Sequence, residues 1–165
     1  MFIKFLLQIF FITLLISNLD ADSINLDLGA KSKHLIEGDF NEDHTWKGIA
    51  YRFIEKKDYS VQIEYANFIN SYNDDTRFYA VTGIYTPLYY KEAAFGLALS
   101  VGHQKGYCVN IQGTKPCNND NPENDNESML LLYSLYGKLQ NFMVYYTYIP
   151  HSVQAIRFSA TAFKW

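Results

Sequence analysis

The strongest constraint on this chain is a two-residue alternation of side chains that recurs along its length. It is clearest over residues 59–66, where Tyr59, Val61 and Ile63 share one parity and Gln62 and Glu64 share the other. Alternation of this period predicts a β-strand with two different faces. A strand in the core of a soluble sandwich would not place Gln and Glu on a buried face. A membrane barrel can, because its apolar face meets lipid and its polar face lines the lumen.

Similar segments account for most of the chain after its first 22 residues. The expected strands are 24–35, 46–54, 59–66, 78–85, 95–102, 128–136, 139–149 and 153–165. Pro87 should end the fourth strand, because proline cannot donate to a ladder. Gly137 and Lys138 should form a tight turn. The sequence therefore predicts an all-β fold, an eight-stranded antiparallel transmembrane β-barrel.

The lengths of the connections and the last residues of the chain support this fold. If the first strand starts in the periplasm, the short turns lie there and the long connections lie outside, which is the pattern of outer-membrane barrels. The chain ends on Phe163-Lys164-Trp165 with no polar tail. An aromatic last strand is typical of barrels in which that strand closes the sheet against the first.

Two strands depart from strict alternation. In the last one, Arg157 and Ser159 share a parity with Phe163 and Trp165. In the first one, His34 shares a parity with the apolar start of the strand, so a β-bulge is needed to turn it toward the lumen.

The first residues indicate export. Met1 to Lys4 is a short basic start, residues 5–16 are almost wholly apolar, and Ala21 offers a small residue for cleavage, which is the layout of a secretory signal peptide. A transmembrane anchor is the alternative, but the apolar run is shorter than the roughly 20 residues that a spanning helix needs. We expect a signal peptide over 1–21, an outer-membrane β-barrel over 22–165, and location in the bacterial outer membrane.

Composition agrees with this class. Aromatic residues make up 17% of the chain, which suits aromatic girdles at a membrane interface but also an aromatic-rich soluble sandwich. The net charge is −3, and the Lys and Arg residues form no basic block, so no nucleic-acid partner is expected.

The two cysteines, Cys108 and Cys117, lie in one long polar segment between expected strands. An even number of Cys in an exported chain predicts a disulfide. Two Cys without further Cys or His nearby rarely hold zinc, so we expect neither a metal nor a cofactor.

The expected fifth strand has one face made only of small residues: Gly96, Ala98, Ser100 and Gly102. If this face points into the lumen, it leaves room for an acyl chain or another small ligand. The alternative is that the small residues allow close packing against large neighbours. The sequence leaves both interpretations open.

Several short motifs, in order, resemble the lipid A palmitoyltransferases of the PagP type. Residues 40–42 (Phe-Asn-Glu) with 46–48 (Trp-Lys-Gly) are similar to the opening of that family's second strand, and 68–71 (Phe-Ile-Asn-Ser) to the end of its third. Residues 86–88 (Thr-Pro-Leu), the small-residue strand from Phe95, and 146–150 (Tyr-Thr-Tyr-Ile-Pro) match later motifs. The resemblance covers most of the chain after the leader.

This resemblance implies transfer of an acyl chain, similar to palmitate, from a phospholipid donor to a lipid A acceptor in the outer leaflet. It places the family's catalytic His on His34 and its Asp-Ser pair on Asn70 and Ser71, so an Asn replaces the Asp. A His in this position can act as a general base on the acceptor hydroxyl. The small residues of the fifth strand would hold the acyl chain, and Pro150 would open a lateral gap for lipid entry. A monomer is expected.

Two other functions remain open. A small barrel of this kind can have a non-catalytic role, stabilising the membrane or binding a partner through its long connection. A deacylase is also compatible, because a His and a Ser at the rim can serve hydrolysis. Of the other histidines, His44 and His151 are expected in loops.

Overall fold

The computed structural model describes residues 23–35, 40–71, 75–106, 127–149 and 153–165. The expected signal peptide over 1–21, the pair Cys108 and Cys117, His151 and Pro150 lie outside these residues, so those predictions stand as they are. No helix within the described ranges is long and apolar enough to cross a membrane.

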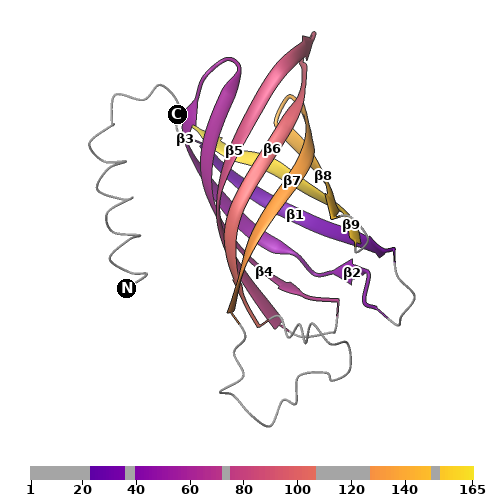
Figure 1. Cartoon of the computed structure of the whole chain (residues 1–165). Helices are drawn as coiled ribbons and strands as arrows, with labels where there is room; N and C mark the ends of the chain where they lie inside the picture. Colours follow the sequence, from indigo (N-terminus) through magenta and orange to yellow (C-terminus); the bar gives the residue numbers. More distant parts are fainter. Residues whose placement is uncertain (1–22, 36–39, 72–74, 107–126, 150–152) are drawn as a thin grey trace.

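The described chain is a single antiparallel sheet (Figure 1). Its strands are β1 (Ser23–His34), β2 (Asp43–His44), β3 (Lys47–Glu55), β4 (Tyr59–Ile69), β5 (Asp75–Tyr90), β6 (Ala93–Lys105), β7 (Glu127–Leu139), β8 (Phe142–Ile149) and β9 (Val153–Lys164).

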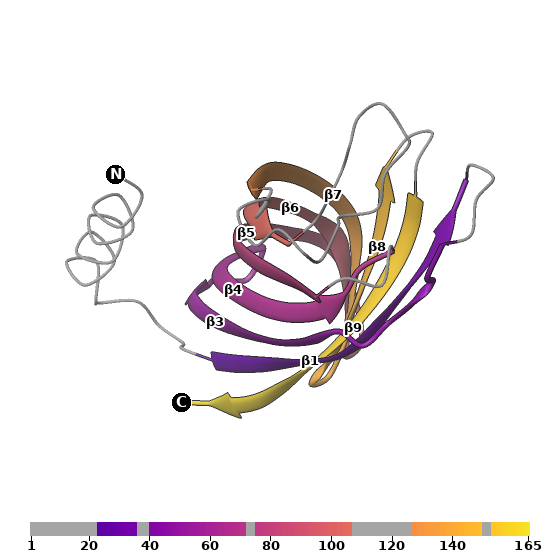
Figure 2. The same cartoon turned by 90° about the horizontal axis from the view of Figure 1, so that it is seen from below.

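The sheet closes on itself. Neighbouring strands pair in chain order, and β9 returns to pair with β1 along its whole length, as the view along the barrel shows (Figure 2). The two-residue β2 and the following β3 both pair with β1, so together they occupy one place in the wall. The wall therefore has eight strands, which confirms the predicted fold class.

The two ends of the barrel differ in their connections. At one end lie the start of β1, the end of β9 and the short turns 56–58, 91–92 and 140–141 (Figure 1). At the other end lie His34, Ile69, Lys105 and the starts of β5 and β7, where the longer connections begin. Short turns face the periplasm in outer-membrane barrels. We call the two ends the periplasmic mouth and the outer rim.

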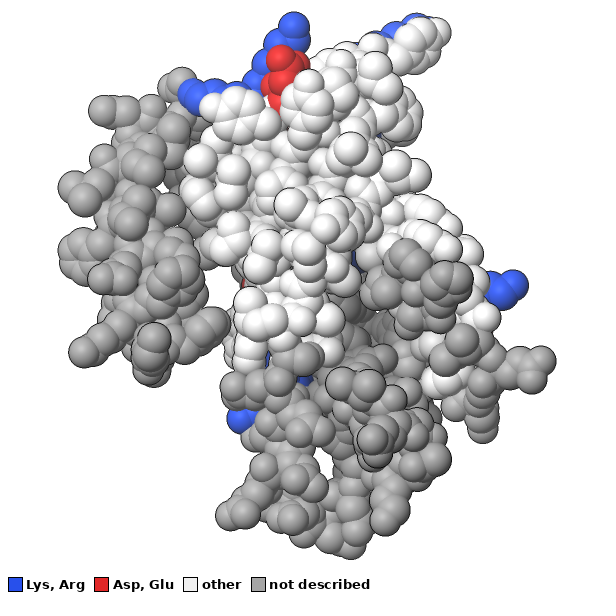
Figure 3. Space-filling model, viewed as in Figure 1, with Lys and Arg blue, Asp and Glu red and all other residues white. Residues whose placement is uncertain are grey.

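The outside of the barrel is apolar. Its middle carries exposed aliphatic side chains, and in Figure 3 this part of the described wall is almost entirely uncharged. Exposed aromatic side chains follow toward the periplasmic mouth: Tyr59, Tyr85, Tyr89, Tyr90, Phe95, Phe142, Phe163 and Trp165. An apolar band bordered by an aromatic girdle is the surface that a bilayer requires of a barrel.

The lumen is polar, and side chains fill its middle. The alternation predicted for residues 59–66 is confirmed, because Gln62 and Glu64 are 1% and 5% exposed while Ile63 and Tyr65 face outward. Arg157 donates to Glu64 over 2.5 Å, and its guanidinium lies 4.2 Å from the ring centre of Tyr145. Gln62 donates to Glu64 over 2.7 Å. These side chains from β4, β8 and β9 contact one another through the middle of the barrel. We call this group, Gln62, Glu64, Tyr145 and Arg157, the cross-brace.

Two β-bulges explain the irregular alternation of the first and last strands. Leu28 is an extra residue in β1 opposite β9, next to Gly29, whose φ of 154° suits a residue without a Cβ. The inward parity of β1 changes there, so His34 faces the lumen as predicted. Ala162 is the extra residue in β9, and it turns Phe163 outward.

Two predicted strand boundaries are wrong. β5 does not end before Pro87 but continues to Tyr90, because the register shift between Tyr85 and Leu88 leaves the proline outside the regular ladder with β6. The last tight turn is at 140–141 rather than at Gly137-Lys138. Gly137 pairs within β7 on both edges, and the ring of Phe95 lies 3.8 Å from the position of its missing Cβ.

The small residues of β6 face inward, and large side chains pack against two of them, Ala98 and Gly102. A Cβ on Gly102 would lie 2.5 Å from the ring of Phe78, and Ala98 packs in one cluster with Tyr136 and Met143. Ser100 is held by a hydrogen bond of 2.7 Å with Thr82. The packing favours the second of the two interpretations, in which small residues make room for large neighbours.

Candidate functional site at the outer rim

His34 ends β1 with its side chain turned into the rim and 9% exposed. Its ring stacks on Phe40 with 4.1 Å between ring centres, and its backbone N–H donates to Glu42 Oε1 over 3.1 Å. Its Nδ1 is buried without a hydrogen-bond partner and lies 3.9 Å from Glu42 Oε1. Burial lowers the pKa of His34, the charge of Glu42 opposes this, and His44 adds to the lowering, so the pKa lies below its usual value. The surroundings of His34 therefore favour its neutral ring.

Asn70 and Ser71 lie on the same rim, where their hydrogen bonds hold neighbouring segments together. The Asn70 side chain is fully buried and donates to Thr76 Oγ1 over 3.0 Å and to the Gly106 carbonyl over 3.2 Å. The carbonyl of Ser71 accepts from the Asn41 backbone N–H over 2.9 Å. An amide is needed for these contacts because a carboxylate cannot donate. This gives a structural reason for Asn at the position where the resembled family has Asp.

Asn41 and Glu42 join the two parts of the predicted site. Asn41 also donates through its side chain to the Asn70 carbonyl over 3.2 Å, and the next residue, Glu42, contacts His34. The segment 40–42 therefore lies between His34 on β1 and Asn70 at the end of β4. The structure brings the three predicted residues to one rim through this intervening segment.

His44 was missed by the sequence analysis, which expected it in a loop. It lies in β2, where its Nδ1 is 2.7 Å from the Ile69 carbonyl and its Nε2 is 2.8 Å from Ser32 Oγ. A carbonyl only accepts, so Nδ1 carries the proton, and in the neutral ring Nε2 accepts from the Ser32 hydroxyl. The pairing follows from the register of β1 with β2 and has no signature in the spacing of residues 32 and 44.

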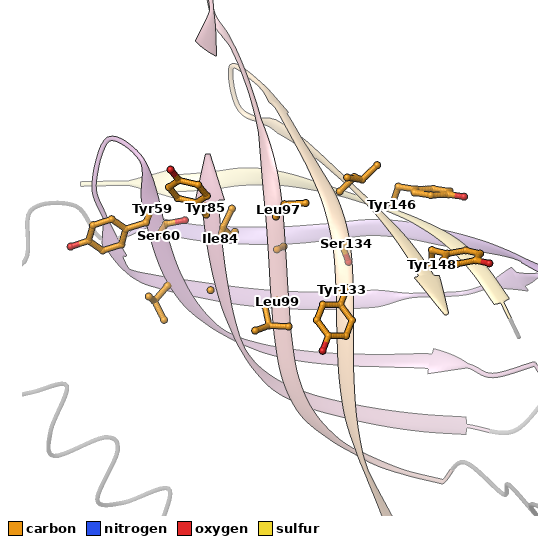
Figure 4. Close-up of a pocket in the computed structure, with 14 residues that line it drawn as sticks. Tyr59, Ser60, Ile84, Tyr85, Leu97, Leu99, Tyr133, Ser134, Tyr146 and Tyr148 are labelled. Carbon is orange, nitrogen blue, oxygen red and sulfur yellow. The ribbon is translucent and has the colours of Figure 1, made fainter. Parts of the chain in front are cut away.

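The outer wall bears a hollow that crosses the strands from β4 to β8. It lies on the lipid side around Gly83, where no atom occupies the space of a side chain, and Figure 4 shows tyrosines from four strands around it. Leu97 and Leu99 are among its lining residues, and it reaches from Tyr59 to Tyr148. It is a recess in the apolar band of the wall.

The wall is not paired equally on both sides of β7. β6 pairs with β7 from Ala93–Leu139 to Lys105–Glu127, whereas β8 pairs with it only from Leu139–Phe142 to Ser134–Thr147. Beyond Ser134, the described part of β7 pairs with β6 alone, and Tyr148 of β8 pairs with β9 alone. The two strands therefore part in the outer half of the wall. The lateral gap was predicted at Pro150, which lies outside the described residues. Within the described wall, the ladder between β7 and β8 is open beyond the pair of Ser134 with Thr147.

No protein-family model and no curated protein matches the chain. Among solved structures, it is similar to Ail, the attachment invasion locus protein of Yersinia pestis, with 14% sequence identity, a TM-score of 0.50, and coverage of 89% of this chain and 99% of that one. A second Ail structure, with the heparin analogue sucrose octasulfate, gives 18% identity, the same TM-score, and coverage of 88% and 98%. The N-terminal β-barrel domain of OprF from Pseudomonas aeruginosa has 8% sequence identity and a TM-score of 0.50, with coverage of 89% of this chain and 98% of that one.

These likenesses establish the fold. With its closed eight-stranded wall, apolar band and aromatic girdle, the chain is a small outer-membrane β-barrel. They lend no support to the palmitoyltransferase resemblance.

Proposed function

We propose that this protein is a non-catalytic outer-membrane barrel that stabilises the membrane and binds a partner at its outer rim. The observation that carries the proposal is the filled lumen. Glu64 and Arg157 are held by a hydrogen bond across the middle of the barrel, Arg52 is held by Gln62, and large side chains pack against Ala98 and Gly102 of β6. This arrangement suits a rigid wall better than a chamber for an acyl chain.

The outer rim supports the binding role. Asn70, Asn41 and His44 tie the ends of β1, β4 and β5 together, so the connections at that end start from fixed points. Binding sites are often carried by loops on such a rigid scaffold. Ail is named for attachment and has a structure with a heparin analogue, but at 18% identity this adds a precedent for the fold only.

Complementation tests this proposal. A deletion strain should regain its resistance to detergent equally from the wild type and from Ser32→Ala, His34→Ala and His44→Ala, provided that each variant shows the heat-modifiable gel mobility of a folded barrel. Lipid A from all these strains should have the same mass spectrum. A change in lipid A acylation that depends on the protein would contradict the proposal.

Acyl-ester chemistry at the outer rim is a second candidate, and the contact between Ser32 and His44 favours it. A nucleophile within hydrogen-bond reach of a base, with the base held by a third group, is the arrangement of nucleophilic catalysis. Here the Ile69 carbonyl is the third group. Ser32 Oγ would attack the ester carbonyl and pass its proton to His44 Nε2, which returns it to the leaving alcohol. A lipid A hydroxyl or water would then take the acyl group from Ser32, and His44 would take the proton of this acceptor and return it to Ser32 Oγ.

Labelling with a fluorophosphonate probe separates the two candidates. If the second is right, the probe should modify the folded protein in detergent, Ser32→Ala and His44→Ala should abolish labelling, and lipid A from wild-type cells should gain or lose an acyl chain. Ser100→Ala is the matched control, because Ser100 is also an inward hydroxyl but bonds to Thr82 instead of a histidine. Equal labelling of wild type and Ser32→Ala would exclude this nucleophile.

A further inference from the structure

The periplasmic mouth holds a second polar feature, which neither proposed function uses. It is a bowl of about 350 Å³ set into the end of the lumen, between the turns 56–58 and the ends of β7 and β9. Its charged lining residues are Arg52, Glu55, Lys56, Lys57, Lys138 and Lys164. Figure 3 shows Lys and Arg gathered at this end of the molecule.

The charges of the bowl do not balance. Glu55 is the one carboxylate in its lining, and it accepts from Lys138 over 3.2 Å and from Lys164 over 2.8 Å. Arg52 lies 3.7 Å from the same carboxylate. Burial alone would raise the pKa of Glu55, but the hydrogen bond from Lys164 and the charge of Lys138 outweigh it, so the pKa is lowered and the group stays ionised. One carboxylate shared by three cations leaves a positive excess.

The floor of the bowl is rigid. Arg52 is 2% exposed, and its guanidinium donates twice to Gln62 Oε1, over 2.9 and 3.2 Å. Hydroxyl groups stand beside it in the lining, because Ser60, Thr86 and Tyr89 all border the bowl and Thr86 bonds to Tyr89 over 3.1 Å. Cations with neutral hydroxyl donors around them form the surroundings that a phosphate oxygen requires.

We propose that this bowl binds a phosphate group at the periplasmic face of the outer membrane. The phosphate has two possible sources, the head group of an anionic phospholipid in the inner leaflet and free phosphate in the periplasm. The girdle of Tyr59, Tyr85 and Trp165 fixes the level of the lipid head groups at this end, so the bowl opens where such head groups lie. Clustered Lys and Arg near a membrane surface attract anionic lipids with about 1 kcal/mol for each residue.

Two measurements on the folded full-length barrel in detergent test the proposal. Native mass spectrometry with equal amounts of phosphatidylglycerol and phosphatidylcholine should show preferential retention of phosphatidylglycerol. Isothermal calorimetry with inorganic phosphate, in the absence of lipid, should show whether free phosphate also binds. Phosphatidylglycerol retention without phosphate binding identifies the lipid head group as the ligand, and binding of both shows that phosphate alone is sufficient.

Charge variants locate the site. Lys138→Gln and Lys164→Gln should each weaken binding about fivefold, as expected for the loss of one cation near the surface. Glu55→Gln should strengthen it, because the competing carboxylate is lost. Lys91→Gln is the matched control, since Lys91 lies in the turn 91–92 at the same mouth but lies over Tyr90 and does not border the bowl.

The results that would overturn the proposal are equally specific. Equal retention of the two lipids together with no heat of phosphate binding would show that the bowl binds no phosphate. An effect of Lys91→Gln as large as that of Lys138→Gln would show that anions are attracted by the overall positive charge of the mouth and not by a defined site in the bowl. Weaker binding by Glu55→Gln would show that the carboxylate organises the site instead of competing with it.

Discussion

The middle of the lumen and the outer rim each contain a pair of oppositely ionisable groups, and the two pairs differ in how closely they are held. Glu64 and Arg157 meet at 2.5 Å, with Gln62 and Tyr145 completing their surroundings. His34 and Glu42 lie 3.9 Å apart, Glu42 is half exposed, and Nδ1 of His34 has no hydrogen-bond partner. The middle pair is saturated by the protein itself, while the rim pair retains a buried polar atom without a hydrogen-bond partner.

The largest effect is expected from breaking the middle pair. Arg157→Met should lower the free energy of unfolding by about 3–5 kcal/mol, because it leaves the buried Glu64 carboxylate without its cation. Urea unfolding of the barrel in detergent measures this. The double variant Glu64→Gln/Arg157→Met should regain most of the loss. If the single variant is as stable as the wild type, the cross-brace does not support the barrel.

A smaller loss of stability is expected from a change at Asn70 on the outer rim. Asn70→Asp should cost about 1–3 kcal/mol, because the new carboxylate faces Thr76 and Gly106 oxygens without a proton to donate. The same measurement applies, with Asn67→Asp as an exposed control on β4. Restored acyl transfer by Asn70→Asp, with unchanged stability, would instead support the role of a catalytic carboxylate at this position.

Filling the small face of β6 tests whether the lumen has spare volume. Gly102→Val should destabilise the barrel by about 1–3 kcal/mol, because the new side chain meets the ring of Phe78. Gly83→Val, at the outward glycine whose side-chain position is open, is the control and should have little effect. Tolerance of Gly102→Val would indicate that Phe78 can move and that the lumen has room for a ligand.

The smallest effect concerns the rim. NMR titration should show that His34 has a pKa below that of a histidine in an unfolded chain. As pH falls, the unfolded chain then takes up the proton first. The His34 contribution therefore lowers stability as the pH drops through the unfolded value, and it levels off below the folded one. Glu42→Gln removes the opposing charge and should lower the pKa of His34 further. A pKa above the usual value would show that Glu42 dominates the environment of this ring.

Much of this fold could be predicted from local pattern. The alternation over 59–66 identified both faces of β4 because a strand has a period of two, and the irregular parity near His34 correctly required a bulge. The pattern failed at Pro87 and Gly137, where pairing with neighbouring strands decided where the strand ended.

The predicted site shared this limitation. His34, Asn70 and Ser71 do lie on one rim, but the contacts of Asn70 with Gly106 and of His44 with Ser32 join residues far apart in the chain. The same is true of the brace between Glu64 and Arg157 and of the lysines around Glu55. Only the closed register of the sheet brings such residues together, and no local spacing encodes it.

The extra residue at Leu28 has a wider consequence. It works as a phase shift, so that β1 carries one alternation before Gly29 and the opposite one after it. Without the bulge, the same sequence in regular alternation would turn Ser32 and His34 to face lipid and Lys31 and Lys33 to face the lumen. The bulge alone therefore decides which set of side chains on β1 faces the lumen at the rim, with no substitution at the rim itself.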